Sequence, residues 1–130
     1  MTHEELKAAA VAMLDRAYVP YSHFPVGAAL ECSDGTVFTG CNIENASYTP
    51  TICAERTAVS KAVSEGHRDF VRIVIAGRSE DFCVPCGVCR QVLREFAPEL
   101  EIICLNGAGE ERVFTLPELL PHSFGPEYLL

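Results

Sequence analysis

The sequence predicts a three-layer α/β/α sandwich built on a mixed five-stranded sheet, formed by a single domain over residues 1–130. Five short runs are rich in β-branched and apolar residues, and three segments with helical character lie between and before them. The last two of these runs are separated by only a few residues, too few for a crossover, so they should pair antiparallel. No repeat, low-complexity tract or linker marks a domain boundary.

The first element should be a helix. Thr2 followed three residues later by Glu5 is typical of a capping box, and apolar residues recur at helical spacing over 6–17. Pro20 disfavours helical angles at the residue before it, so the helix should stop near Tyr18.

A hairpin, a second helix and a central strand follow. Residues 26–43 form two β-rich runs around the turn 33–35. Residues 53–66 are good helix formers and end on a glycine, where a C-terminal cap belongs. Residues 70–77, FVRIVIAG, are almost wholly apolar, which suits a strand covered on both faces.

The last part of the chain offers a third helix and two strands. Segment 85–98 begins with a proline suited to the first helical turn and closes before a second proline. Runs 101–105 and 112–116 are short strands. Residues 117–130 predict one helical turn and an irregular tail.

The length, cysteine number and net charge of the chain exclude several classes of protein function. A chain of 130 residues buries a sizeable core without disulfides, and seven cysteines, an odd number, with no secretory signal indicate the reducing cytoplasm. No apolar stretch is long enough to span a membrane. A formal charge of −8 would repel a nucleic-acid backbone. A small neutral substrate and self-association stay open, since 48% of the residues are apolar.

A cysteine pair indicates a metal site. Cys86 and Cys89 have the spacing that offers two sulfurs to one metal from a single turn. An iron–sulfur pattern would continue with a fourth cysteine, but Leu93 stands there. A closed structural zinc site would need further ligands, conceivably Cys53, Cys104 or His67.

The segment CAER at 53–56 is the better partner for this pair. Three protein ligands leave zinc one position for water, which is the catalytic arrangement. Glu55, near the metal but not bound to it, could then move protons. Side chains two apart on a helix point to nearly opposite sides, so Cys53 must have non-helical angles if both are to converge.

CAER followed by PCGVCRQ at 85–91 resembles the zinc-dependent cytidine deaminases. Cys53 stands two positions before the glutamate, and a cysteine at that position resembles the branch of the family whose members act on free nucleosides. The resemblance covers nearly the whole chain, because three further segments also match: PYSHFPVGAAL at 20–30, FTGCNIENASY at 38–48 and LLPHSFG at 119–125.

The resemblance implies that Cys53, Cys86 and Cys89 bind zinc and that Glu55 is the catalytic proton shuttle. Three thiolates around Zn²⁺ leave a net charge of −1. Arg56 would offset it by donating hydrogen bonds to ligand sulfurs.

The resemblance also implies the substrate contacts. Asn42 and Glu44 are similar to the family's ribose-binding pair. Phe24 would lie against the pyrimidine, and Ala54 would contribute backbone groups to the base. Tyr48 and Phe124 would reach a neighbouring subunit's pocket, because relatives of this size are homotetramers with shared sites.

The reaction implied is hydrolytic deamination of cytidine and deoxycytidine to the uridine nucleosides, with release of ammonia, in pyrimidine salvage. One alternative is a related zinc deaminase acting on a guanine base, a cytosine antibiotic or a nucleotide, although Glu44 would repel a phosphate. The other is a non-catalytic zinc or iron–sulfur binding module. That module would have four ligands and no need of Glu55.

The remaining cysteines receive no function. Cys32, Cys41 and Cys104 fall on strands or strand ends and should be small buried hydrophobic residues. Cys83, just before the ligand pair, is also expected to be buried without a role, although a redox-sensitive thiol is an alternative.

Overall fold

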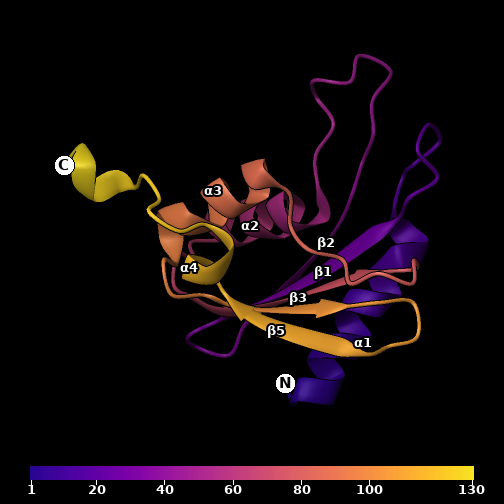
Figure 1. The fold of residues 1–130 in the computed structure, drawn as a ribbon, viewed down its shortest axis with the longest axis horizontal. Helices are drawn as coiled ribbons and strands as arrows, with labels where there is room; N and C mark the ends of the chain where they lie inside the picture. Colours follow the sequence, from indigo (N-terminus) through magenta and orange to yellow (C-terminus); the bar gives the residue numbers. More distant parts are fainter.

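The computed structural model describes residues 1–130 and contains one five-stranded sheet with helices on both faces (Figure 1). The strands are β1 (Val26–Cys32), β2 (Val37–Cys41), β3 (Phe70–Gly77), β4 (Glu101–Leu105) and β5 (Glu111–Thr115). The α-helices are α1 (His3–Ala12), α2 (Ala54–Ser64), α3 (Gly87–Phe96) and α4 (Leu116–Leu119). Two 3₁₀ turns, η1 (Met13–Arg16) and η2 (Pro126–Tyr128), complete the structure.

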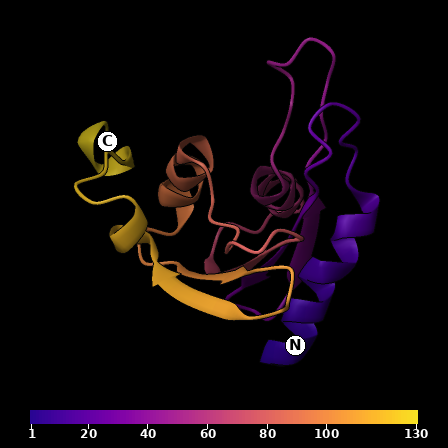
Figure 2. The ribbon, with the colours of Figure 1, turned by 45° about the vertical axis from the view of Figure 1, so that its right-hand side comes forward.

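The sheet has the order β2-β1-β3-β4-β5 and is mixed, as the sequence predicts. Strands β3 and β4 pair parallel, joined by the crossover that contains α3. The other three pairings are antiparallel, including the β1–β2 and β4–β5 hairpins. Helix α1 lies on one face of the sheet, and α2 and α3 lie on the other (Figure 2). The predicted fold class is therefore confirmed.

Strand β3 contributes to a hydrophobic core on each face of the sheet. Ile73 and Ile75 belong to the larger cluster, beneath α2 and α3, whereas Val74 and Ala76 belong to the cluster beneath α1. All four are fully buried. Alternate side chains of a strand point to opposite faces, so an apolar residue at every position is what two covered faces require.

Two helix boundaries differ from the sequence prediction. The capping box of Thr2 and Glu5 is present, but α1 tightens into η1 after Ala12 instead of continuing as a regular helix. Pro85 was predicted in the first turn of the third helix, and this is wrong. Cys86 is the N-cap, with extended angles of φ −69° and ψ 168°, so α3 begins at Gly87, two residues after Pro85.

Close packing of β2 against α2 fixes where α2 begins. A Cβ atom on Gly40 would lie 2.3 Å from the Ala54 carbonyl oxygen and 2.7 Å from the Ala58 amide nitrogen. Glycine lets the strand approach the first turn of the helix. The segment 42–53, between β2 and α2, extends away from the body of the molecule (Figure 1). None of the helices has the length and apolar character needed to cross a membrane.

Candidate active site and metal centre

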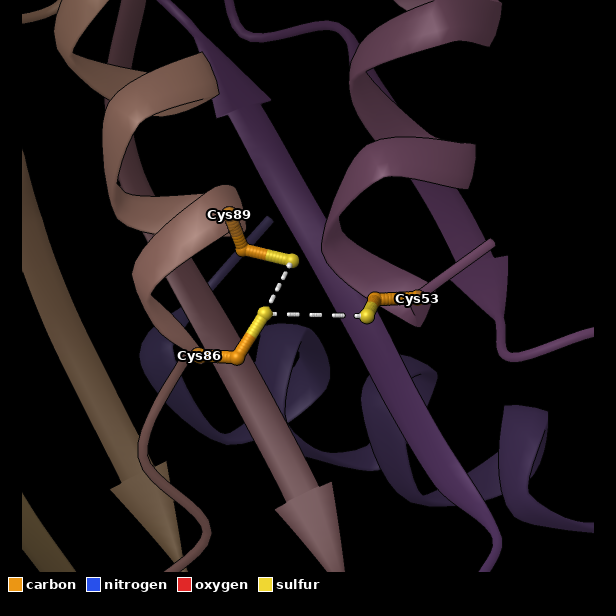
Figure 3. A group of neighbouring side chains, drawn as sticks. All are labelled: Cys53, Cys86 and Cys89. Atoms are coloured by element: carbon orange, nitrogen blue, oxygen red, sulfur yellow. Dashed lines mark hydrogen bonds between the residues drawn. The ribbon is translucent and has the colours of Figure 1, made fainter. Parts of the chain in front are cut away.

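Three cysteine sulfurs meet between the first turns of α2 and α3 (Figure 3). Cys53 is the N-cap of α2 and Cys86 the N-cap of α3, while Cys89 lies in the first turn of α3. The Cys53 and Cys86 sulfurs are 3.8 Å apart, and those of Cys86 and Cys89 are 3.4 Å apart. All three lie within 4.8 Å of one another.

These spacings fit one zinc ion. Zn–S bonds of about 2.3 Å in a tetrahedral site place neighbouring sulfurs ~3.8 Å apart. Thiolates are soft donors that zinc accepts readily. The group contains only Cys53, Cys86 and Cys89. The donor set thus matches the three-ligand arrangement rather than the closed four-ligand one.

Positive charge surrounds the sulfurs. Both N-caps place cysteine at the positive end of a helix dipole. Arg56 Nη2 lies 3.5 Å from Cys53 Sγ. Hydrogen bonds from Cys89, and then from Arg56, lower the pKa of Cys53 to about 5, whereas the same bond to Cys53 raises the pKa of Cys89. The cluster therefore favours thiolate at Cys53 before a metal arrives.

Glu55 is buried beside the sulfurs, with only 4% of its surface exposed. Burial raises the pKa of its carboxyl group to about 7. The N-cap geometry of Cys53, φ −78° and ψ 158°, allows both residues to face the same space, as the sequence predicts. That space is a cavity of about 140 Å³, lined by Glu55 together with Cys53 and Cys86. A carboxyl group with such a pKa can both accept and donate a proton near neutrality.

Three predicted substrate contacts line the same cavity: Phe24, Asn42 and Ala54. Val26, Cys83 and Val84 complete its walls, and the sequence predicts none of these three as a site residue. Cys83 stands three residues before Cys86, and its proximity to the ligand pair was the one signal that could have identified it. The walls thus come from four separate parts of the chain.

Asn42 and Glu44 both brace the segment before β1. Asn42 Oδ1 accepts a hydrogen bond from the Val26 amide at 2.9 Å, and its Nδ2 donates to the Phe24 carbonyl at 2.8 Å. Glu44 accepts from the amides of residues 21–22 at 3.0 and 3.2 Å, and hydrogen bonds from Ser22 lower its pKa. Glu44 lines a different, open hollow and does not line the cavity.

Tyr48 and Phe124 lie outside the cavity of their own chain. Tyr48 is 73% exposed and packs edge-on against Tyr21, with ring centroids 6.3 Å apart. Phe124 is 55% exposed and stacks on Tyr128 at 5.2 Å. Within one chain the structure does not bring these two aromatic residues to the site.

Comparison with known proteins places this geometry in a family. Residues 1–105 match the model of the cytidine and deoxycytidylate deaminase zinc-binding region. The chain is 46% identical over 130 residues to a cytidine deaminase of Sporosarcina psychrophila, covering 99% of this chain and 96% of that protein. It is 46% identical over 134 residues to a probable cytidine deaminase of Dictyostelium discoideum, covering 100% of this chain and 90% of that one.

Solved structures agree with the sequence matches. Cytidine deaminase from Burkholderia pseudomallei superposes with a TM-score of 0.92 at 48% identity, covering 95% of this chain and all of that one. The enzyme from Mycobacterium tuberculosis gives 0.83 at 38% identity, with 96% and 98% covered. The chain therefore belongs to the family of zinc-binding cytidine and deoxycytidylate deaminases.

Proposed function

We propose that this protein is a zinc-dependent cytidine deaminase that hydrolyses cytidine and deoxycytidine to uridine and deoxyuridine with release of ammonia. The observation that carries the proposal is a buried glutamate with a pKa near neutrality, sharing one small cavity with a three-sulfur metal site. A binding module would have no use for such a carboxyl group. A catalyst that must move protons requires one.

The reaction assigns one role to each part of the site. Cys53, Cys86 and Cys89 would hold zinc, which supplies a Lewis acid that makes water a better nucleophile. Glu55 accepts a proton from the attacking water and delivers it to ring nitrogen N3 as the water oxygen bonds to C4. Glu55 then carries the second proton to the amino group. The C4–N bond breaks, so that cytidine and water become uridine and ammonia.

Substrate selection would rest on the cavity walls. Phe24 would lie against the pyrimidine ring and Ala54 would offer backbone groups to its polar edge. Asn42 and Glu44 would bind the sugar hydroxyls, Asn42 from the cavity wall and Glu44 from a separate open hollow. Its carboxylate, kept ionised by a lowered pKa, would repel a phosphate, which favours nucleosides over nucleotides.

We further propose a homotetramer with active sites shared between subunits, located in the cytoplasm. Tyr48 and Phe124 support sharing, because they are exposed and do not line the cavity of their own chain. Seven free cysteines, three of them needed as metal ligands, support a reducing compartment.

Ammonia release from a panel of compounds tests the proposed reaction. Zinc-loaded protein is incubated with cytidine, deoxycytidine, cytidine monophosphate, cytosine and guanine, and the ultraviolet spectrum is recorded in parallel. We expect turnover of the two nucleosides only. Turnover of guanine or the nucleotide would favour the related deaminases, and release from none would favour the non-catalytic module.

A further inference from the structure

Cys83 lines the catalytic cavity although it does not belong to the three-sulfur group. It comes from the segment between β3 and α3, which also supplies Val84 and Cys86 to the walls. The same cavity is lined by the buried Glu55 carboxyl group and by two of the three sulfurs, those of Cys53 and Cys86. Cys83 is thus a wall of a substrate site rather than an isolated thiol.

The backbone and the side chain of Cys83 are both held in place, so neither can move away from the cavity. The Cys83 amide donates a hydrogen bond to the Leu105 carbonyl at 3.1 Å, which ties it to the end of β4. Behind it, a Cβ atom placed on Gly77 would lie 3.1 Å from Cys83 Cβ and 3.4 Å from Cys83 Sγ. The side chain therefore already packs against the end of β3. A larger residue at position 83 can extend only into the cavity.

The Cys83 side chain can affect a bound substrate through its size but not through a charge. Burial raises the pKa of its thiol to about 12, so it stays uncharged at neutral pH. A neutral thiol behaves as a small hydrophobic group. Cys83 therefore acts on a substrate through shape.

The proposed function orients the base in the cavity, and the present inference rests on it. The amino-bearing carbon C4 and nitrogen N3 must face the sulfurs and Glu55. Carbon C5 is the other ring neighbour of C4, so it lies on the side away from Glu55. We propose that Cys83 is a specificity-determining residue, whose small side chain sets the size of the substituent that a cytosine nucleoside may carry at C5.

Substituted cytidines test the inference. kcat and KM are measured for cytidine and 5-methylcytidine, and the ratio of their kcat/KM values is compared among wild type, Cys83→Ala, Cys83→Ser and Cys83→Ile. One methylene in a closed pocket changes kcat/KM by about 10- to 200-fold. Cys83→Ala should therefore raise the 5-methylcytidine to cytidine ratio by roughly tenfold or more, and Cys83→Ile should lower it as strongly. Cys83→Ser, nearly the same size, should keep the wild-type ratio.

Cys104→Ala is the matched control, because Cys104 is buried in the core and does not line the cavity. It should leave the ratio unchanged even if it lowers stability. Zinc content is measured on every sample, and the Ala and Ser variants decide the outcome if Cys83→Ile does not fold. A ratio within about twofold of wild type in Cys83→Ala would overturn the inference. Failure of wild type to deaminate cytidine would overturn the proposed function instead.

Discussion

At the scale of single residues, the proposed chemistry depends on one carboxyl group kept out of water beside three thiols. Glu55 is 4% exposed, and burial is the main reason its pKa rises to about 7. Such a group stabilises the folded chain only while it is protonated. The function thus has a cost in stability that pH should reveal.

The zinc-free protein should lose stability as pH rises, through Glu55. Folding raises the pKa of Glu55 from 4.5 to about 7, so the folded state keeps a proton that the unfolded chain releases. The contribution is fully present below about pH 4.5 and is lost as pH rises to about 7. Relative to Glu55→Gln, wild type should lose about 3 kcal/mol of unfolding free energy between pH 4.5 and pH 8.

Urea unfolding with a chelator and a reductant measures this difference. Glu99→Gln, at an exposed position, is the matched control and should follow wild type at every pH. A constant difference between wild type and Glu55→Gln across this range would show that Glu55 titrates normally.

At the scale of elements, the site lies between the N-terminal ends of α2 and α3. Close packing of β2 against α2 fixes the position of the first of these ends. Cys53 and Cys86 both leave the helical angles as N-caps, which turns their sulfurs toward each other. Strand β2 touches the first turn of α2 through Gly40, whose missing side chain leaves room for the Ala54 carbonyl. The position of Cys53 and Glu55 therefore depends on one glycine.

Gly40→Ala should displace the start of α2. A Cβ atom 2.3 Å from a carbonyl oxygen must push the helix away, at a cost of about 1–3 kcal/mol. We expect a lower melting temperature and weaker zinc binding, measured by competition with a chromophoric chelator. Gly87→Ala is the control, since its Cβ meets nothing within 4 Å although it lies between two proposed zinc ligands. Equal zinc affinity in the two variants would contradict this account.

The outer face of α3 holds the C-terminal segment. Arg94 Nε donates to Ser123 Oγ at 2.7 Å, and its guanidinium pairs with Glu127. Gln91 Nε2 donates to the Phe124 carbonyl at 2.9 Å. Charge-assisted bonds of this kind order a chain segment that has few buried contacts of its own.

Arg94→Ala should therefore release this segment. Hydrogen exchange at the amides of Tyr128 and Leu129, which bond within the final turn, should accelerate by roughly tenfold, while exchange in β3 stays slow. Arg68→Ala, at an exposed arginine between α2 and β3, should change neither. Unchanged exchange at Tyr128 in Arg94→Ala would mean that the contacts of Arg94 with Ser123 and Glu127 do not order the C-terminal segment.

The regular elements could be predicted from the sequence because periodicity and turn chemistry encode them. Residues 70–77 form the expected central strand and 26–43 the expected hairpin. The α3 boundary could not be predicted, since Pro85 fits equally well before a helix as inside one. Cavity walls such as Cys83 and Val26 depend on how loops dock against strand ends, which no local pattern records.

At the scale of the whole molecule, the proposed homotetramer would complete each site with residues of another chain. Tyr48 and Phe124 are the candidates, because both are exposed and neither lines the cavity of its own chain. A net charge of −8 would make the proposed association of copies sensitive to salt, because like charges repel one another.

Subunit complementation tests whether sites are shared. Phe124→Ala and Glu55→Gln chains should each have low activity alone. A mixed oligomer should regain activity, because some sites then combine an intact Glu55 with an intact Phe124 from different chains. A random tetramer of equal parts restores up to about a quarter of the sites. A mixture no more active than the sum of its parts would contradict sharing.

The central claim is that Glu55 moves protons beside a metal that it does not bind, and one measurement tests it directly. Turnover of cytidine by Glu55→Gln is recorded on samples whose zinc content is determined at the same time. We predict full zinc occupancy, as in wild type, with kcat reduced by about 10²-fold or more. Wild-type turnover in the zinc-loaded variant, or loss of zinc together with activity, would contradict the assigned role of Glu55.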